Sequence, residues 1–233
     1  MRYQDEFTVK GRKELKHAIS QMDYTILKNK LKHVMTLDTN AGRDGKYFIR
    51  SVYFDNFDNK ILNEKKEGYF KRDKYRVRIY GKSSDLIKLE KKSKRNNLTF
   101  KEKCYISKHE YEWIRIGEIE WMENDERQLI RELYIQMTLY QLKPMTVVDY
   151  VREAYIYPYG NIRVTFDSQI KTSLRNVDIF NPDLAMVPVF DPTQVILEVK
   201  YDEYLPDIIK MTLQMMDRRP DAYSKYQLSR MYG

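Results

Sequence analysis

Cations and apolar residues alternate along the segment 74–80, which reads KYRVRIY. A period of two is typical of a β-strand, because successive side chains of a strand point to opposite faces. One face of this predicted strand is therefore positive and the other apolar. Side chains on the same face lie only about 6 to 7 Å apart, so Lys74, Arg76 and Arg78 repel one another unless an anion lies beside them.

The same alternation returns in four other segments. Their polar faces carry Lys88, Glu90 and Lys92; Tyr150 and Arg152; Arg163, Thr165 and Asp167; and Glu198 and Lys200. Such faces point either outward to solvent, as in a half-buried antiparallel sheet, or inward across a water-filled barrel. The alternation alone favours the sheet. Helical segments elsewhere in the chain could cover the apolar faces from outside, and they favour the barrel.

The positive charge of the chain is local. The 233 residues carry a net charge of +8, but residues 60–103 hold sixteen basic and six acidic residues, and the remaining residues sum to −2. A basic segment this dense is typical of proteins that bind a polyanion, such as nucleic acid, an anionic membrane surface or a phosphate chain. A solvated basic face explains the count equally well.

The composition excludes several kinds of site. A single cysteine, Cys104, forms no internal disulfide, and three scattered histidines give no zinc-finger spacing. The string nearest to a phosphate-binding glycine loop, residues 42–46, has the wrong spacing, so phosphate would be bound by side chains. No signal peptide and no stretch of roughly 18 apolar residues is present, which predicts a cytoplasmic protein.

Helical spacing predicts most of the remaining elements. Helices are expected over residues 11–34, 107–116, 125–142, 207–218 and 221–231. The second of them begins with a capping box, Ser107-x-x-Glu110. Further strands are expected over residues 47–54 and 98–106. No repeat or linker divides the chain, which predicts one α+β domain over residues 1–233.

Eight short strings follow one another in a characteristic order. They are Ser51-x-Tyr53-Phe54-Asp55, Lys74-x-Arg76-x-Arg78-x-Tyr80, Leu89-Glu90-x-Lys92, Lys101-x-Lys103, Tyr150-x-Arg152-x-Ala154-Tyr155, Arg163-Val164-Thr165-Phe166-Asp167, Leu197-Glu198-Val199-Lys200 and Ser224-Lys225-Tyr226. Together they resemble the catalytic domain of the vacuolar transporter chaperone (VTC) family, the polyphosphate polymerases. The resemblance spans nearly the whole chain.

This resemblance implies both a fold and a site. The family belongs to the CYTH-like triphosphate tunnel metalloenzymes, which implies an antiparallel, closed, eight-stranded β-barrel with a charged interior and helices packed outside. It implies catalytic cations at Arg76, Arg78, Lys92, Arg152, Lys200 and Lys225. It implies further phosphate-binding residues at Lys65, Lys74, Lys101, Lys103, Arg163 and Tyr53. A divalent metal, Mn²⁺ or Mg²⁺, would be held by Glu198, with Glu6 and Glu90 as further acidic residues of the interior.

One departure from the family pattern concerns its first strand, which usually carries Arg-x-Glu-x-Lys. The resemblance places this strand at Gln4-x-Glu6-x-Thr8, which keeps only the glutamate. Lys10 lies one pleat further on the same face. Since the missing lysine contacts the transferring phosphate in the family, this departure leaves open whether the chain turns over its substrate.

The implied reaction is transfer of the γ-phosphate of ATP to a growing polyphosphate chain. The attacking phosphate is already an anion, so no general base is needed, and none of the usual nucleophile and histidine constellations is present. One alternative is a tunnel triphosphatase, and another is a non-catalytic domain that binds polyphosphate or inositol polyphosphate. Nucleic-acid binding ranks third. The partners are then ATP and polyphosphate, and any export of polymer would need a separate membrane protein.

Overall fold

The computed structural model describes residues 11–81, 85–213 and 224–230. The strands in this part of the chain are β1 (Lys13–Ser20), β2 (Thr36–Leu37), β3 (Lys46–Asp55), β4 (Lys71–Tyr80), β5 (Ile87–Arg95), β6 (Leu98–Ile106), β7 (Lys143–Tyr157), β8 (Ile162–Thr172), β9 (Val187–Pro188) and β10 (Gln194–Tyr201). The helices are α1 (Gln21–Leu31), α2 (Lys60–Lys66), α3 (Lys108–Ile116), α4 (Gln128–Tyr140), α5 (Asp207–Leu213) and α6 (Lys225–Ser229), with short 3₁₀ turns η1 (Glu120–Met122) and η2 (Tyr159–Asn161).

All strands join one antiparallel sheet, which confirms the α+β class. Eight of them follow the order β1-β10-β8-β7-β3-β4-β5-β6, while β2 pairs with β7 and β9 with β8. The predicted closed barrel is wrong, because the two end strands do not pair along their length. Among residues 11–81, 85–213 and 224–230, they meet at one isolated bridge between Arg12 and Thr99. Beyond the bridge, an ion pair of 2.6 Å between Glu14 of β1 and Lys92 of β5 joins the two ends.

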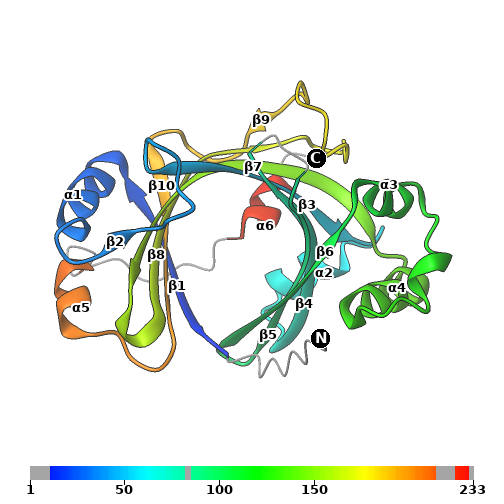
Figure 1. Cartoon of the computed structure of the whole chain (residues 1–233), viewed down its shortest axis with the longest axis horizontal. Helices are drawn as coiled ribbons and strands as arrows, with labels where there is room; N and C mark the ends of the chain where they lie inside the picture. Colours follow the sequence, from blue (N-terminus) through cyan, green and yellow to red (C-terminus); the bar gives the residue numbers. More distant parts are fainter. Residues whose placement is uncertain (1–10, 82–84, 214–223, 231–233) are drawn as a thin grey trace.

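The sheet is strongly curved, with a concave and a convex face (Figure 1). Helices α1 and α5 cover the convex face at one side, and α3 and α4 cover it at the other, whereas α6 lies within the curve. One apolar cluster under α1 and α5 includes Leu27, Phe166 and Leu197. A second, larger cluster lies under α3 and α4, and it extends to the concave face beside α6 through Tyr53 and Tyr226.

The region 11–34, predicted as helical, divides into a strand and a helix. Leu15 and Ile19 are four residues apart, a spacing that fits a helix but also puts both side chains on one face of a strand. The strand β1 ends at Ser20, whose side chain accepts a hydrogen bond from the backbone of Asp23 while the Asp23 carboxylate accepts one from Ser20. This capping box begins α1. The capping box predicted at Ser107 is confirmed.

The last two predicted helices are described only in part. The predicted helix 207–218 is α5 in its first seven residues, and the predicted helix 221–231 is α6 in its middle. Residues 4, 6 and 8, where the resemblance put the first strand, lie outside the described residues. None of the described helices is long and apolar enough to cross a membrane.

Candidate functional site

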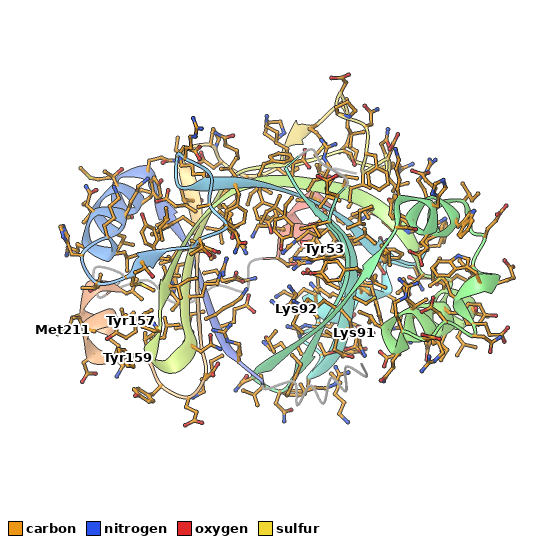
Figure 2. The ribbon with its side chains drawn as sticks, in the orientation of Figure 1. Tyr53, Lys91, Lys92, Tyr157, Tyr159 and Met211 are labelled. Carbon is orange, nitrogen blue, oxygen red and sulfur yellow. The ribbon has the colours of Figure 1, made fainter. Side chains whose placement is uncertain are left out.

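The predicted phosphate-binding residues of β3, β4 and β5 lie on the concave face. Strand pairing sets Arg76 opposite Tyr53 on one side and opposite Glu90 on the other. Residues that are directly opposite in an antiparallel pair share a face. Figure 2 shows Lys92 on the concave side, whereas the next residue, Lys91, points to the convex side, where it forms an ion pair with Glu132 of α4.

Glu90 is a buried carboxylate held by three cations. Arg76 donates to it from Nε over 2.7 Å and from a terminal nitrogen over 2.6 Å. Arg78 lies 3.7 Å away and Lys101 forms an ion pair with the other oxygen. Burial alone would raise the pKa of Glu90, but these cations outweigh it and hold the pKa well below its ordinary value. Glu90 is therefore ionised, and three cations share one negative charge.

Arg78 is held in one orientation by neutral partners. Its Nε donates to the Ser51 hydroxyl over 3.2 Å, and its Nη2 donates to the Tyr150 hydroxyl over 2.9 Å. The side chain is only 4% exposed. Its hydrogen-bond partners are neutral, and Glu90, which lies 3.7 Å away, is shared with Arg76 and Lys101, so the charge of Arg78 is only partly compensated.

A second cluster joins β7, β8 and α6. Arg152 donates two hydrogen bonds to Asp167, of 2.6 and 2.7 Å, and Lys225 of α6 forms an ion pair with the same carboxylate. Burial alone would raise the pKa of Asp167, but Arg152 and Lys225 lower it to about 2. The Lys225 ammonium also lies 4.6 Å from the centre of the Tyr150 ring, an attractive cation–π distance.

The third cluster surrounds Glu198 on β10. Lys200 and Lys16 lie 3.0 and 3.2 Å from its oxygens, and Arg152 lies 3.5 Å away. Glu14 is adjacent to Glu198 and contacts Lys16 and Lys92. Burial opposes ionisation of Glu198, yet Lys200 and Lys16 hold its pKa well below the ordinary value.

Lys74 and Lys65 belong to the same group of cations, but within the described residues neither forms an ion pair with a carboxylate. The Lys74 ammonium donates to the hydroxyl of Ser224 over 3.1 Å. Burial and the nearby cations Lys92 and Lys16 keep the pKa of Lys74 well below its ordinary value. Burial, together with Arg72, Lys16 and Lys94, lowers the pKa of Lys65 to about 8. Burial thus disfavours the charged form of each of these ammonium groups, and a bound anion would favour it.

These side chains together are named the cationic cluster. It contains ten cations, Lys16, Lys65, Lys74, Arg76, Arg78, Lys92, Lys101, Arg152, Lys200 and Lys225, and four carboxylates, Glu14, Glu90, Asp167 and Glu198. Ten basic side chains against four carboxylates on one concave face suit a ligand with several negative charges.

Two predicted phosphate-binding residues lie away from the centre of this cluster. Arg163 forms an ion pair with Asp38 and donates to the Tyr47 hydroxyl over 2.7 Å. Lys103 lies opposite Glu90 in the β5–β6 pair but is exposed. Glu6 lies outside the described residues.

Sequence reasoning missed Glu14, Lys16 and Tyr150, and it did not count Asp167 among the site residues. A signal for the first two was present, because Arg12, Glu14 and Lys16 carry the spacing Arg-x-Glu-x-Lys. The periodicity of residues 11–34 hid it, since a helix would scatter these three residues around its axis. The pattern expected in the first strand is therefore present at Arg12, Glu14 and Lys16.

The carboxylates of the cationic cluster determine which metal ion could be bound there. Within the described ranges, no group of three or more His, Cys, Asp or Glu side chains is placed to bind a metal ion. Glu198 and Glu14 offer two adjacent carboxylates on neighbouring strands. Mg²⁺ is commonly bound by one or two carboxylates together with substrate phosphates, so this pair fits such an ion. Glu90, like Glu198, lies among three cations.

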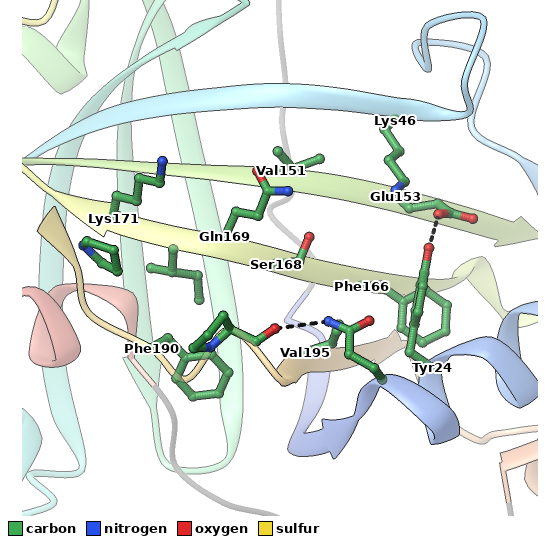
Figure 3. A pocket seen from close by; sticks show the side chains of 14 residues that line it. Tyr24, Lys46, Val151, Glu153, Phe166, Ser168, Gln169, Lys171, Phe190 and Val195 are labelled. Carbon is green, nitrogen blue, oxygen red and sulfur yellow. Dashed lines mark hydrogen bonds between the residues drawn. The ribbon is translucent and has the colours of Figure 1, made fainter. Parts of the chain in front are cut away.

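A separate groove lies on the convex face (Figure 3). Its volume is about 510 Å³, and its lining includes Tyr24, Lys46, Glu153, Gln169 and Phe190. Tyr24 donates to Glu153 over 2.7 Å. The strands β7 and β8 separate this groove from the cationic cluster.

Comparison with known proteins places this geometry in context. A family model described as the VTC domain matches residues 11–232. No curated protein matches the sequence significantly. Among solved structures, a candidate adenylyl cyclase from Hippeastrum, described as having a dominant triphosphatase activity, has a TM-score of 0.50 and 12% identity, covering 88% of this chain and 85% of that one. A candidate adenylate cyclase from Bacillus halodurans has a TM-score of 0.49 and 14% identity over 88% of each chain.

Proposed function

The chain belongs to the VTC domain family, and from this premise we propose that it is a polyphosphate polymerase that transfers the γ-phosphate of ATP to the end of a polyphosphate chain. The observation that supports this most is the cationic cluster, in which ten cations face four carboxylates on one concave surface. Polyphosphate and the triphosphate of ATP are the dense, extended anions that such a surface suits. The predicted family is confirmed, and the reaction is our inference from it.

Phosphoryl transfer between two polyanions depends on positioning and on charge, and these residues supply both. The terminal phosphate of the acceptor attacks the γ-phosphorus, the bond to the β-phosphate oxygen breaks, and ADP leaves. Arg76 and Arg78 present guanidinium groups held by Glu90, Ser51 and Tyr150. An arginine can bind two phosphate oxygens at once, so these groups would hold the equatorial oxygens as charge builds on them.

The remaining cations bring the reactants together. Lys92, Lys200 and Lys16 surround the two carboxylates of β1 and β10, and Lys225 approaches from α6. Glu198 and Glu14 would hold a Mn²⁺ or Mg²⁺ ion, which when bound supplies positive charge to phosphate oxygens. No general base is required, because the acceptor oxygen is already ionised.

One assay tests the proposal directly. Purified protein incubated with ATP and Mn²⁺ should yield ADP and long-chain polyphosphate, detected on a polyacrylamide gel and removed by an exopolyphosphatase. Arg76→Ala should remove most of the product. A preparation that binds ATP but forms no polymer with any divalent metal would overturn the proposal.

A triphosphatase is the second candidate function. The Hippeastrum protein, whose fold is similar, is described by that activity, and the same cluster would hold an inorganic triphosphate. A triphosphatase would release orthophosphate from tripolyphosphate without chain growth, so the ratio of orthophosphate to polymer separates the two. Tight binding with neither product would indicate a non-catalytic polyphosphate-binding domain.

A further inference from the structure

Like charges lie opposite each other at two positions of the β4–β5 pair that share one face of the sheet. Lys74 lies opposite Lys92, and Arg72 lies opposite Lys94. In the next pair along the sheet, Lys92 lies opposite Lys101. Like charges directly opposite each other destabilise a sheet, so this arrangement costs stability in the free protein.

These facing cations differ in their partners. Two that lie near the centre of the cationic cluster form ion pairs with carboxylates, whereas those at its edge form none within the described residues. Lys92 contacts Glu14, and Lys101 contacts Glu90. Arg72 donates to the backbone carbonyl oxygen of Tyr69 over 2.7 Å. Within the described part of the chain, no carboxylate forms an ion pair with Arg72, Lys94 or Lys65.

Three cations without a carboxylate ion pair among the described residues therefore meet at one place. Burial, and after it Arg72, lowers the pKa of both Lys65 and Lys94, which indicates that α2 brings its lysine beside the β4–β5 pair. Arg72 and Arg76 lie four residues apart on the same face, a distance of about 13 Å along a strand. This is further than a single triphosphate held at Arg76 would extend.

We propose that Lys65, Arg72 and Lys94 form a rim subsite that binds phosphate groups of the polyphosphate chain remote from the reacting phosphate. The inference rests on the proposed function, since it needs a polymeric phosphate at the cationic cluster. A chain that runs from Arg76 past Lys74 reaches this subsite at the start of β4. Each further phosphate held there slows release of the growing chain, so the subsite sets product length.

Two double variants with the same change in charge separate this role from general electrostatics. Arg72→Ser/Lys94→Ser removes the subsite pair. Lys71→Ser/Arg95→Ser removes the next cross-strand pair of the same two strands, whose side chains point to the opposite face. Thermal unfolding of both variants checks that the sheet is intact.

Binding is measured by calorimetry with tripolyphosphate and with long-chain polyphosphate. The subsite variant should bind the long chain at least about tenfold more weakly and tripolyphosphate as tightly as the wild type, while the control variant changes neither. The subsite variant should also make shorter polymer from ATP. Equal losses for both ligands, or equal losses in both variants, would overturn the proposal, as would a subsite variant that retains long-chain affinity.

Failure of the proposed function gives a different result. If the wild-type protein makes no polymer, the polymerase proposal fails, yet the binding comparison still tests the subsite because it needs no turnover. If the subsite variant loses affinity for mixed RNA instead of for polyphosphate, the pair serves a nucleic acid and the inference is wrong.

Discussion

The hydroxyl of Tyr226 donates a hydrogen bond of 2.7 Å to the carboxylate of Asp55. The same carboxylate accepts hydrogen bonds from the backbone N–H groups of Ile61 and Leu62, over 2.8 and 3.1 Å. One fully buried side chain at the end of β3 thus holds the first turn of α2 and fixes α6. These two helices carry Lys65 and Lys225, so Asp55 positions two cations that do not come from the sheet.

Tyr226→Phe should loosen α6 without opening a large cavity. The variant leaves one Asp55 oxygen without its hydroxyl donor, which should cost about 1–3 kcal/mol of unfolding free energy. Polymer formation should also fall, because Lys225 adjoins Tyr226. Urea unfolding and the polymer assay measure the two effects. Tyr159→Phe, at an exposed tyrosine, should change neither, and an unchanged unfolding midpoint in Tyr226→Phe would contradict the role of this hydrogen bond.

Arg78→Lys should reduce polymer formation by at least about tenfold. Lysine keeps the charge but cannot donate to both Ser51 and Tyr150, so its ammonium is not held where the guanidinium is. Steady-state rates at saturating ATP measure the loss. The control is Arg115→Lys on the surface of α3, where the arginine pairs with Glu112. Full activity of Arg78→Lys would show that only charge matters at this position.

Polymer formation should need a divalent metal ion, whereas binding of tripolyphosphate should not. Chelation with EDTA should stop polymer formation, yet tripolyphosphate should still bind, because the cationic cluster does not depend on a metal. Glu198→Gln or Glu14→Gln should raise the Mn²⁺ concentration needed for half-maximal activity. Glu132→Gln, on the convex face beside Lys91, is the matched control. An unchanged Mn²⁺ requirement in both site variants would remove these carboxylates as metal ligands.

Lys65→Met should stabilise the free protein at neutral pH. Burial and the cations Arg72, Lys16 and Lys94 lower the pKa of Lys65 to about 8 in the folded protein, whereas an unfolded lysine titrates near 10.5. Between these values the unfolded chain binds more protons, so the unfolding free energy of the wild type rises with pH. The cost of the charged lysine is fully present below pH 8.

The gain of Lys65→Met should therefore be largest near pH 7, be much smaller at pH 10, and vanish only above the unfolded pKa of 10.5. A change of about 1 kcal/mol moves the melting temperature of a chain this long by about 2–4 °C, which thermal unfolding without phosphate can resolve. Polyphosphate should bind the variant more weakly at pH 7. A gain that is the same at both pH values would show that packing, and not charge, causes it.

The strands of the cationic cluster were predictable because each carries a period of two over several residues. The alternation at Arg76 and Arg78 identified the strand and showed that both side chains lie on one face of it. The first strand was not predictable in this way, because Leu15 and Ile19 satisfy helical and extended spacing alike. There the capping box at Ser20 was the better signal, since it marks where the helix begins.

Contacts between distant strands were beyond sequence reasoning. That Glu14 meets Lys92, or that Tyr150 faces Arg78, depends on the curvature and register of the sheet. The barrel was expected to close through backbone pairing, but hydrogen bonding between the ends stops after Arg12 and Thr99. Residue types alone do not specify how far an edge pairing continues.

The pairing of β1 with β10 has a consequence for how the protein forms. Residues 13–20 find their backbone partners in residues 194–201, so the first of the described strands has to wait for the last of them. Folding that depends on partners so far apart in the chain is slow. Until residues 194–201 have been made, β1 lacks its backbone partner, and the part of the cationic cluster that joins Glu14 and Lys16 to Glu198 and Lys200 cannot assemble.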